Sequence, residues 1–141
     1  MIVDANILLY AVDTQSAHHD RAAEWLVSAL NGQRRVGLPW QTLGAFVRIA
    51  THPRVTSHPL GVLEAQRYVE SWVGSRAAWV PPATDRTVRL LVDLCRRHRV
   101  TGNLVTDAQL AALAIENGVE VVSADSDFAR FPEVRWVNPL V

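Results

Sequence analysis

The sequence feature that most constrains the fold is a short apolar run that ends on a carboxylate. Residues 1–3 (Met-Ile-Val) have the composition of a buried strand, Asp4 follows at once, and residues 6–12 read as a short helix. In open α/β sheets, ligands bind outside the carboxyl ends of the strands. An acid in this position therefore predicts a functional edge of the sheet.

Strand-like and helix-like segments alternate along the 141 residues. This alternation predicts an α/β fold, with one central, mainly parallel sheet of about four to five strands flanked by helices on both faces. The length fits a single domain over residues 1–141. The expected strands are 1–3, 35–38, 77–80, 119–123 and 135–137. The expected helices are 6–12, 22–30, 39–50, 65–73, 84–98 and 106–117.

Two later segments carry acids toward the same edge. Thr106 with Gln109 three residues on reads as a capping box, which opens a helix and places Asp107 in its first turn. Asp125 and Asp127 directly follow the strand expected at 119–123. Because right-handed crossovers bring the carboxyl ends of parallel strands to one edge, these acids are expected to converge with the acid of the first strand.

Clustered carboxylates repel one another, so a group of them needs a cation or shifted pKa values. Oxygen ligands of this kind suit Mg²⁺ or Mn²⁺, and no Cys/His cluster has the spacing of a zinc site. One or two such ions can polarise a phosphodiester and activate a water. Taken singly, each acid also has a structural explanation, because Asp107 suits the helix dipole and Asp125 and Asp127 suit a turn.

The composition limits the possible ligands and the cellular location of the protein. The 14 basic residues balance the 14 acidic ones and all are Arg, so no global positive field indicates nucleic acid. The single cysteine, Cys95, fits a reducing compartment. We expect a cytoplasmic protein that does not insert into a membrane, because the sequence shows no basic and then apolar signal peptide and no apolar run as long as a membrane-spanning helix. The five Trp are expected in the core or at interfaces rather than as base-stacking platforms.

Three segments together resemble the motif regions of the PIN-domain nucleases and, within them, the VapC toxins of bacterial toxin–antitoxin pairs. They are Asp4-Ala-Asn6, the stretch 106–114 (Thr-Asp-Ala-Gln-Leu-Ala-Ala-Leu-Ala) and the stretch 123–128 (Ser-Ala-Asp-Ser-Asp-Phe). Residues 39–54 and 128–131 extend the resemblance over nearly the whole chain.

The resemblance implies a set of roles for individual residues. Asp4, Asp107 and Asp125 would be the catalytic, metal-binding acids, and Asp127 would be an additional metal ligand. The supporting residues would be Asn6 and Ser123. The usual fourth acid of the family, a Glu in the helix after the second strand, is missing, because residues 33–63 contain no Asp or Glu. Gln41 or Ala45 occupies its neighbourhood, while Glu116 is expected on the surface.

An acidic metal pocket needs a polyanion brought to it. Arg48 is a candidate RNA contact on the helix expected at 39–50. Arg96, Arg97 and Arg99 are further candidates, although Arg at a helix C-terminus also complements the helix dipole.

The leading hypothesis is a Mg²⁺- or Mn²⁺-dependent endoribonuclease that acts as the toxin of a toxin–antitoxin pair. By resemblance, its partners would be RNA, a VapB-like antitoxin laid into a hydrophobic groove, and a second copy of the chain joined through the early helices. The alternative is a non-catalytic RNA-binding or regulatory module, because the missing Glu weakens the metal site. A phosphatase with Asp4 as nucleophile is disfavoured, since Asn6 replaces its second Asp and the chain has no Lys.

Overall fold

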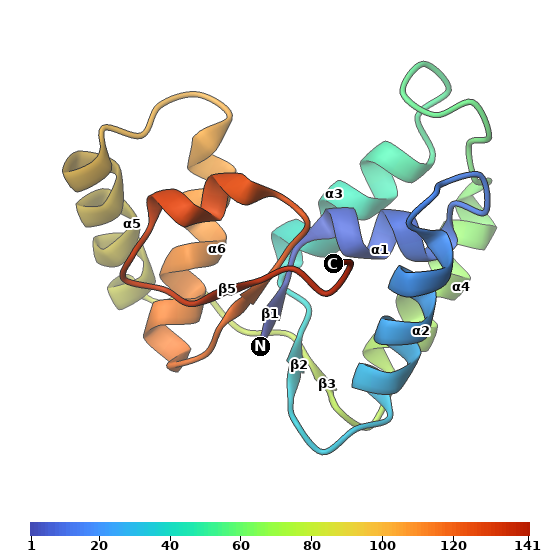
Figure 1. The fold of residues 1–141 in the computed structure, drawn as a ribbon, viewed down its shortest axis with the longest axis horizontal. Helices are drawn as coiled ribbons and strands as arrows, with labels where there is room; N and C mark the ends of the chain where they lie inside the picture. Colours follow the sequence, from blue (N-terminus) through green and yellow to red (C-terminus); the bar gives the residue numbers. More distant parts are fainter.

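The computed structural model describes residues 1–141 and contains one five-stranded sheet. All neighbouring strands are parallel and their order is β3-β2-β1-β4-β5. The predicted α/β fold with a central parallel sheet is therefore confirmed (Figure 1). The strands are β1 (Ile2–Val3), β2 (Val36–Gly37), β3 (Ala78–Trp79), β4 (Val121–Val122) and β5 (Trp136–Val137).

Helices cover both faces of this sheet. Figure 1 shows α1 to α4 on one side of the strands and α5, α6 and the 3-10 helix η1 on the other. No helix is both long enough and apolar enough to cross a membrane. The helices are α1 (Ala5–Val12), α2 (His19–Leu30), α3 (Trp40–Ala50), α4 (Val62–Val73), α5 (Asp85–His98), α6 (Leu104–Asn117) and η1 (Ser126–Arg130).

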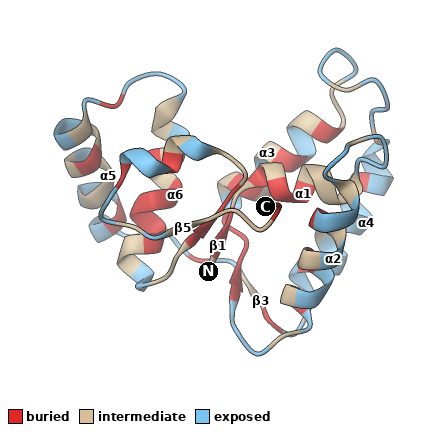
Figure 2. Cartoon of the chain, in the orientation of Figure 1, coloured by how far each residue is buried: buried red, intermediate tan, exposed pale blue.

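The central strands explain the two-sided architecture. Side chains alternate across a strand, and in β1 the fully buried Val3 packs into the apolar cluster under α1 to α4, whereas Ile2 packs into the cluster under α5 and α6. Val122 and Val121 of β4 divide in the same way. Figure 2 shows these strands buried at the centre, with exposed residues on the outer helix faces. A strand of two apolar residues thus holds both layers together.

The helix that carries Asp107 begins earlier than the sequence predicts. The expected capping box at Thr106 is wrong, because α6 starts at Leu104 and the Thr106 hydroxyl donates to the carbonyl oxygen of Asn103 at 2.8 Å. Asp107 is still in the first turn of the helix, as expected. By contrast, α5 begins with a side-chain cap: the Thr84 hydroxyl accepts a hydrogen bond from the backbone N–H of Thr87.

The register of the sheet decides which side chains meet at its carboxyl edge. Ile2 pairs with Val121 and Val3 with Val122, so the next residues along the two strands are Asp4 and Ser123. The backbone N–H of Asp4 donates to the Val122 carbonyl at 3.0 Å and continues the ladder to this point. The segments that leave β1 and β4 therefore emerge side by side.

Candidate active site

Asp4 ends β1 and begins α1. It is the N-cap of that helix, and its Oδ1 accepts the backbone N–H of Ala5 at 2.7 Å, which satisfies one of the unpaired N–H groups of the first turn. Its Oδ2 accepts the Ser123 hydroxyl at 2.7 Å and the Asn6 amide at 3.1 Å. Both oxygens are thus held, so the orientation of this carboxylate is fixed by the fold.

Ser123 is the centre of the hydrogen-bond network beside Asp4. Its side chain is fully buried, and its hydroxyl oxygen accepts the Asn6 amide and the backbone N–H of Asp125, each at 3.0 Å. The Asn6 oxygen in turn accepts the backbone N–H of Ala124 at 3.2 Å. The indole N–H of Trp136 donates to the Ser123 carbonyl at 2.9 Å. Asn6 and Ser123, the predicted supporting residues, are therefore hydrogen-bonded to Asp4 and to each other.

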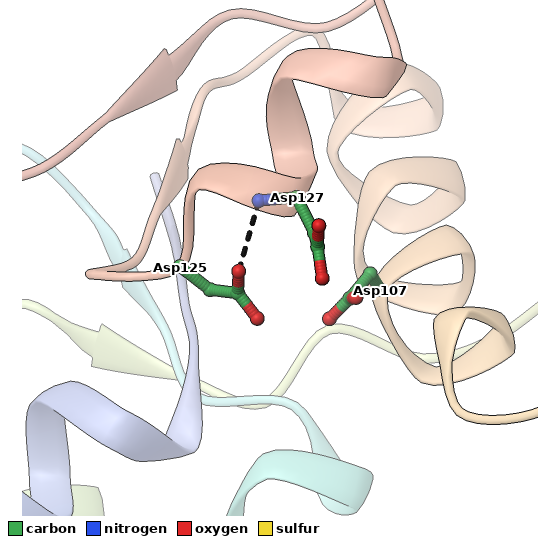
Figure 3. Close-up of side chains that lie close together, drawn as sticks. All are labelled: Asp107, Asp125 and Asp127. Carbon is green, nitrogen blue, oxygen red and sulfur yellow. Dashed lines mark hydrogen bonds between the residues drawn. The ribbon is translucent and has the colours of Figure 1, made fainter.

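Three further carboxylates converge next to this network. Asp107 comes from the first turn of α6, and Asp125 and Asp127 come from the N-cap and first turn of η1. Figure 3 shows all three side chains pointing into the same space, and one carboxylate oxygen of each lies within 4.8 Å of the others. Asp125 Oδ1 also accepts the backbone N–H of Asp127 at 2.9 Å, which holds the segment after β4 in place.

The concentration of negative charge shows in the pKa values. Burial, followed by the charges of Asp125, Asp4 and Asp127, raises the pKa of Asp107 from 3.8 to about 7. Burial also raises the pKa of Asp4, against the lowering effect of the hydrogen bonds from Ser123 and Ala5. A pocket that resists ionisation of its own carboxylates is one that a cation would stabilise.

The structure separates the predicted acids into two sets. Asp107, Asp125 and Asp127 form the close group, and Asp4 lies beside it, near enough that its charge raises the pKa of Asp107 and that the charge of Asp125 raises the pKa of Asp4. No acid from α3 joins them, because that helix contains none. Glu116 lies at the surface but is only partly exposed, and its carboxylate accepts the hydroxyls of Thr84 and Thr87, which ties the end of α6 to the start of α5.

The candidate RNA-binding arginines differ in their surroundings. Arg96 pairs with Asp93 at 2.9 Å, and Arg97 pairs with Asp93 at 2.8 Å and with Glu133 at 3.0 Å. Arg99 ends α5 in the left-handed backbone region, with φ 51°. Arg48 is exposed on α3 and makes no ion pair. Arg48 and Arg99 therefore have uncommitted charges, whereas Arg96 and Arg97 are already paired.

Sequence patterns missed three residues around the site. The buried Thr42 hydroxyl donates to the Val3 carbonyl at 2.8 Å and fastens α3 to the end of β1. Trp136 supports Ser123 from the neighbouring strand, and no local pattern signals either bond because the partners are distant in sequence. Trp40, expected in the core or at an interface, lies outside the core and is 82% exposed.

Sequence comparison identifies relatives over the full chain. Residues 1–134 match the PIN domain. The chain is 45% identical over 138 residues to the protein named Ribonuclease VapC37 of Mycobacterium tuberculosis, which covers 98% of this chain and 96% of that protein. It is 39% identical over 140 residues to Ribonuclease VapC33 of the same organism, which covers 99% and 98%.

Solved structures share the fold at much lower identity. VapC20 of Mycobacterium tuberculosis, described as a Sarcin-Ricin loop cleaving toxin, aligns with a TM-score of 0.70 and 20% identity over 95% of this chain and 98% of that one. VapBC2 from Rickettsia felis, bound to a DNA fragment from its promoter, aligns with a TM-score of 0.72 and 16% identity over 97% and 96%. These alignments support the fold.

Proposed function

Because this chain belongs to the PIN-domain family, among the VapC ribonucleases, we propose that it is the toxin of a type II toxin–antitoxin pair. In this proposal it is an endoribonuclease that hydrolyses RNA phosphodiester bonds. The observation that carries the proposal is the convergence of Asp107, Asp125 and Asp127 beside the fixed carboxylate of Asp4. Relatives named ribonucleases over nearly the full chain support the same conclusion.

A divalent cation fits this group of acids. Carboxylate oxygens from three side chains lie within 4.8 Å of one another, a donor set that suits Mg²⁺ or Mn²⁺. In the proposal, Asp4, Asp107 and Asp125 are the metal-binding acids and Asp127 is an additional ligand. When bound, such an ion polarises the scissile phosphodiester and offsets the charge that develops on the leaving oxygen.

The protein's own groups have distinct tasks in this scheme. The hydrogen bonds from Ser123, Asn6 and Ala5 hold Asp4 in one orientation, so binding requires little ordering of that side chain. Asp107 is partly protonated near neutral pH in the metal-free protein, since its pKa is raised to about 7. A bound cation would favour its ionised form, in which it could serve as a ligand.

A divalent-cation requirement for RNA cleavage tests the proposal. Mg²⁺ is expected to support cleavage of single-stranded RNA, and excess EDTA to abolish it. Asp4→Asn and Asp107→Asn are each expected to lose nearly all activity. Asp85→Asn is a matched control, because Asp85 lies in the first turn of α5, is exposed, and is not among the clustered carboxylates. Cleavage that continues in EDTA would overturn the metal mechanism.

The absence of an acid from α3 supports one alternative, a non-catalytic RNA-binding or regulatory module. A site that lacks one carboxylate binds a metal ion less tightly than a complete site does. The loss of affinity is larger for a second ion than for the first. RNA that binds to cleanly purified protein but stays intact across a Mg²⁺ and Mn²⁺ titration would favour this alternative. Cleavage that saturates at a raised cation concentration would favour the enzyme.

An antitoxin partner is part of the proposal, since relatives of this fold were solved as toxin–antitoxin complexes. A mostly apolar cavity of about 300 Å³ opens between α1, the end of α3 and the loop that follows α3, and we assign it to an amphipathic antitoxin segment. Its apolar lining consists of Leu9, Tyr10, Val12, Ile49, Ala50, Val55 and Leu60. The proposal also includes a homodimer joined through the early helices. The protein would act in the cytoplasm, where both its RNA substrate and the antitoxin are present.

A further inference from the structure

Trp40 is the most conspicuous side chain that the proposed function leaves unexplained. It is the first residue of α3 and is 82% exposed, more than any other large apolar side chain except Val141 at the C-terminus. Tryptophan carries one of the largest apolar surfaces of any side chain, and burying that surface is strongly favourable. An exposed indole of this size is therefore a candidate contact for a binding partner, and its neighbours on the surface decide which kind.

Trp40 lies at the same edge of the sheet as the acids. Ile2 of β1 pairs with Gly37 of β2, so the chain leaves β2 toward Trp40 beside the point where it leaves β1 toward Asp4. Neighbouring strands are about 4.8 Å apart, and the hydrogen bond from Thr42 to the end of β1 keeps the first turn of α3 against this edge. The backbone of Trp40 is thus held at the edge of the sheet that carries the candidate active site.

The exposed face of α3 continues from Trp40 to Gly44 and Arg48, at successive intervals of four residues. We call these three residues the α3 face. A Cβ atom built on Gly44 would meet no atom within 4 Å, so packing within the chain does not require glycine there. Arg48 is exposed and unpaired, and residues 33–63 contain no carboxylate. The face is therefore aromatic at one end, bare in the middle and positive at the other.

We propose that the α3 face binds a single-stranded stretch of the RNA substrate, with a base stacked on Trp40 and a phosphate bound by Arg48. The proposal rests on the proposed ribonuclease function and extends it to the residues that position the substrate. Stacking on an aromatic ring requires an unpaired base, which favours single-stranded RNA. Eight helical residues span about 12 Å, so the two contacts fit one short stretch of strand leading to the acids.

Charge complementarity favours RNA over a protein partner for this face. An acid-free helix with an unpaired arginine attracts a polyanion and offers no carboxylate to repel one. Gly44 leaves the helix backbone open between the two side chains, where a larger residue would stand between the indole and the guanidinium. A second copy of this chain is the competing occupant, and it is an outcome of the test.

Binding can be measured without turnover. In an Asp107→Asn background with EDTA, the fluorescence anisotropy of an end-labelled single-stranded oligoribonucleotide should rise on binding and yield a Kd that does not depend on the tryptophans of the protein. Trp40→Ala should weaken binding on the order of ten-fold, whereas Trp40→Phe, which keeps a ring, should retain most of the affinity. Gly44→Glu should weaken binding by adding a carboxylate to the face. Trp25→Phe on α2 is the control and should leave the affinity unchanged.

Two results would overturn the assignment. One is a Trp40→Ala protein that binds the oligoribonucleotide as tightly as its parent. The other is a Trp40→Ala protein whose sedimentation shows that the substitution dissociates a dimer, which would assign the indole to a subunit interface. Failure of the ribonuclease proposal is distinguishable, because wild-type protein would then bind RNA through Trp40 without cleaving it in Mg²⁺.

Discussion

The Ser123 hydroxyl donates a hydrogen bond of 2.7 Å to Oδ2 of Asp4, across 119 positions of sequence. The two residues follow paired positions of adjacent parallel strands, so the register of β1 and β4 brings them together. The same hydroxyl accepts from the Asn6 amide and from the backbone N–H of Asp125. One buried oxygen therefore couples the first acid of the site to the segment that carries the last ones.

Ser123→Ala should loosen this edge of the sheet. The substitution leaves the backbone N–H of Asp125 without its acceptor and removes one of the two hydrogen bonds donated by the Asn6 amide. An unsatisfied buried polar group costs about 1–3 kcal/mol. It also removes a hydrogen bond that lowers the pKa of Asp4. We expect urea unfolding to show that loss of stability, and calorimetry to show weaker Mg²⁺ binding. Ser126→Ala is the matched control, because Ser126 is exposed and lies at the start of η1 between Asp125 and Asp127.

The sequence allowed the site to be predicted wherever a local pattern coincides with topology. Asp4 follows an apolar strand, and parallel connectivity then implies that acids after β4 reach the same edge. The exact relation of Asp127 to Asp125 depends on the η1 turn, which no periodicity reveals. The exposure of Trp40 could not be predicted either, because an aromatic residue beside a strand is usually buried and only the packed structure shows that no element covers this one.

Asp107 should make the stability of the metal-free protein depend on pH. Its pKa is raised from 3.8 to about 7 by burial and by neighbouring carboxylates. Between these values the folded state binds more protons than the unfolded state, so this group's contribution to stability declines as the pH rises from about 4 to about 7 and levels off above that. Asp107→Asn should flatten this part of the Tm profile in EDTA, while Asp85→Asn should not.

The rise in Tm that added Mg²⁺ produces should increase with pH in the same melting experiments. A cation competes with the proton on Asp107, so its stabilising effect on Tm should be larger above neutral pH than at about pH 5. An equal Mg²⁺ shift at both pH values in wild-type protein would contradict the assignment of Asp107 as a metal ligand.

Asp125 and Asp127 should differ in importance. Asp125 caps η1, accepts the backbone N–H of Asp127 and influences the pKa of Asp4. The Asp127 side chain is 45% exposed and lies 3.7 Å from Arg130 Nε, so part of its charge is already balanced. We expect Asp127→Asn to retain more RNA cleavage than Asp125→Asn at saturating Mg²⁺. Equal loss in the two variants, with both folded by circular dichroism, would assign Asp127 a direct role.

Two glycines should respond in opposite directions to the same substitution. A Cβ at Gly37 in β2 would lie 2.7 Å from Ile2 Cδ1 and 2.9 Å from the Met1 carbonyl oxygen, and that backbone atom cannot move without disturbing the β1–β2 pair. Gly37→Ala should therefore destabilise the protein by about 1–3 kcal/mol. Gly44→Ala in α3 meets open space and improves helix propensity, so it should stabilise the protein by about 0.5–1 kcal/mol.

The glycine pair also separates packing from substrate binding. Gly37 contacts the strand that leads to Asp4, so Gly37→Ala should reduce RNA cleavage together with stability, as measured by urea unfolding and initial rates. Gly44→Ala should raise stability without a matching rise in cleavage, because the gain comes from the helix backbone and not from the site. A destabilised Gly44→Ala protein would show that the middle of the α3 face is covered in solution, and would contradict its assignment as an open surface for RNA.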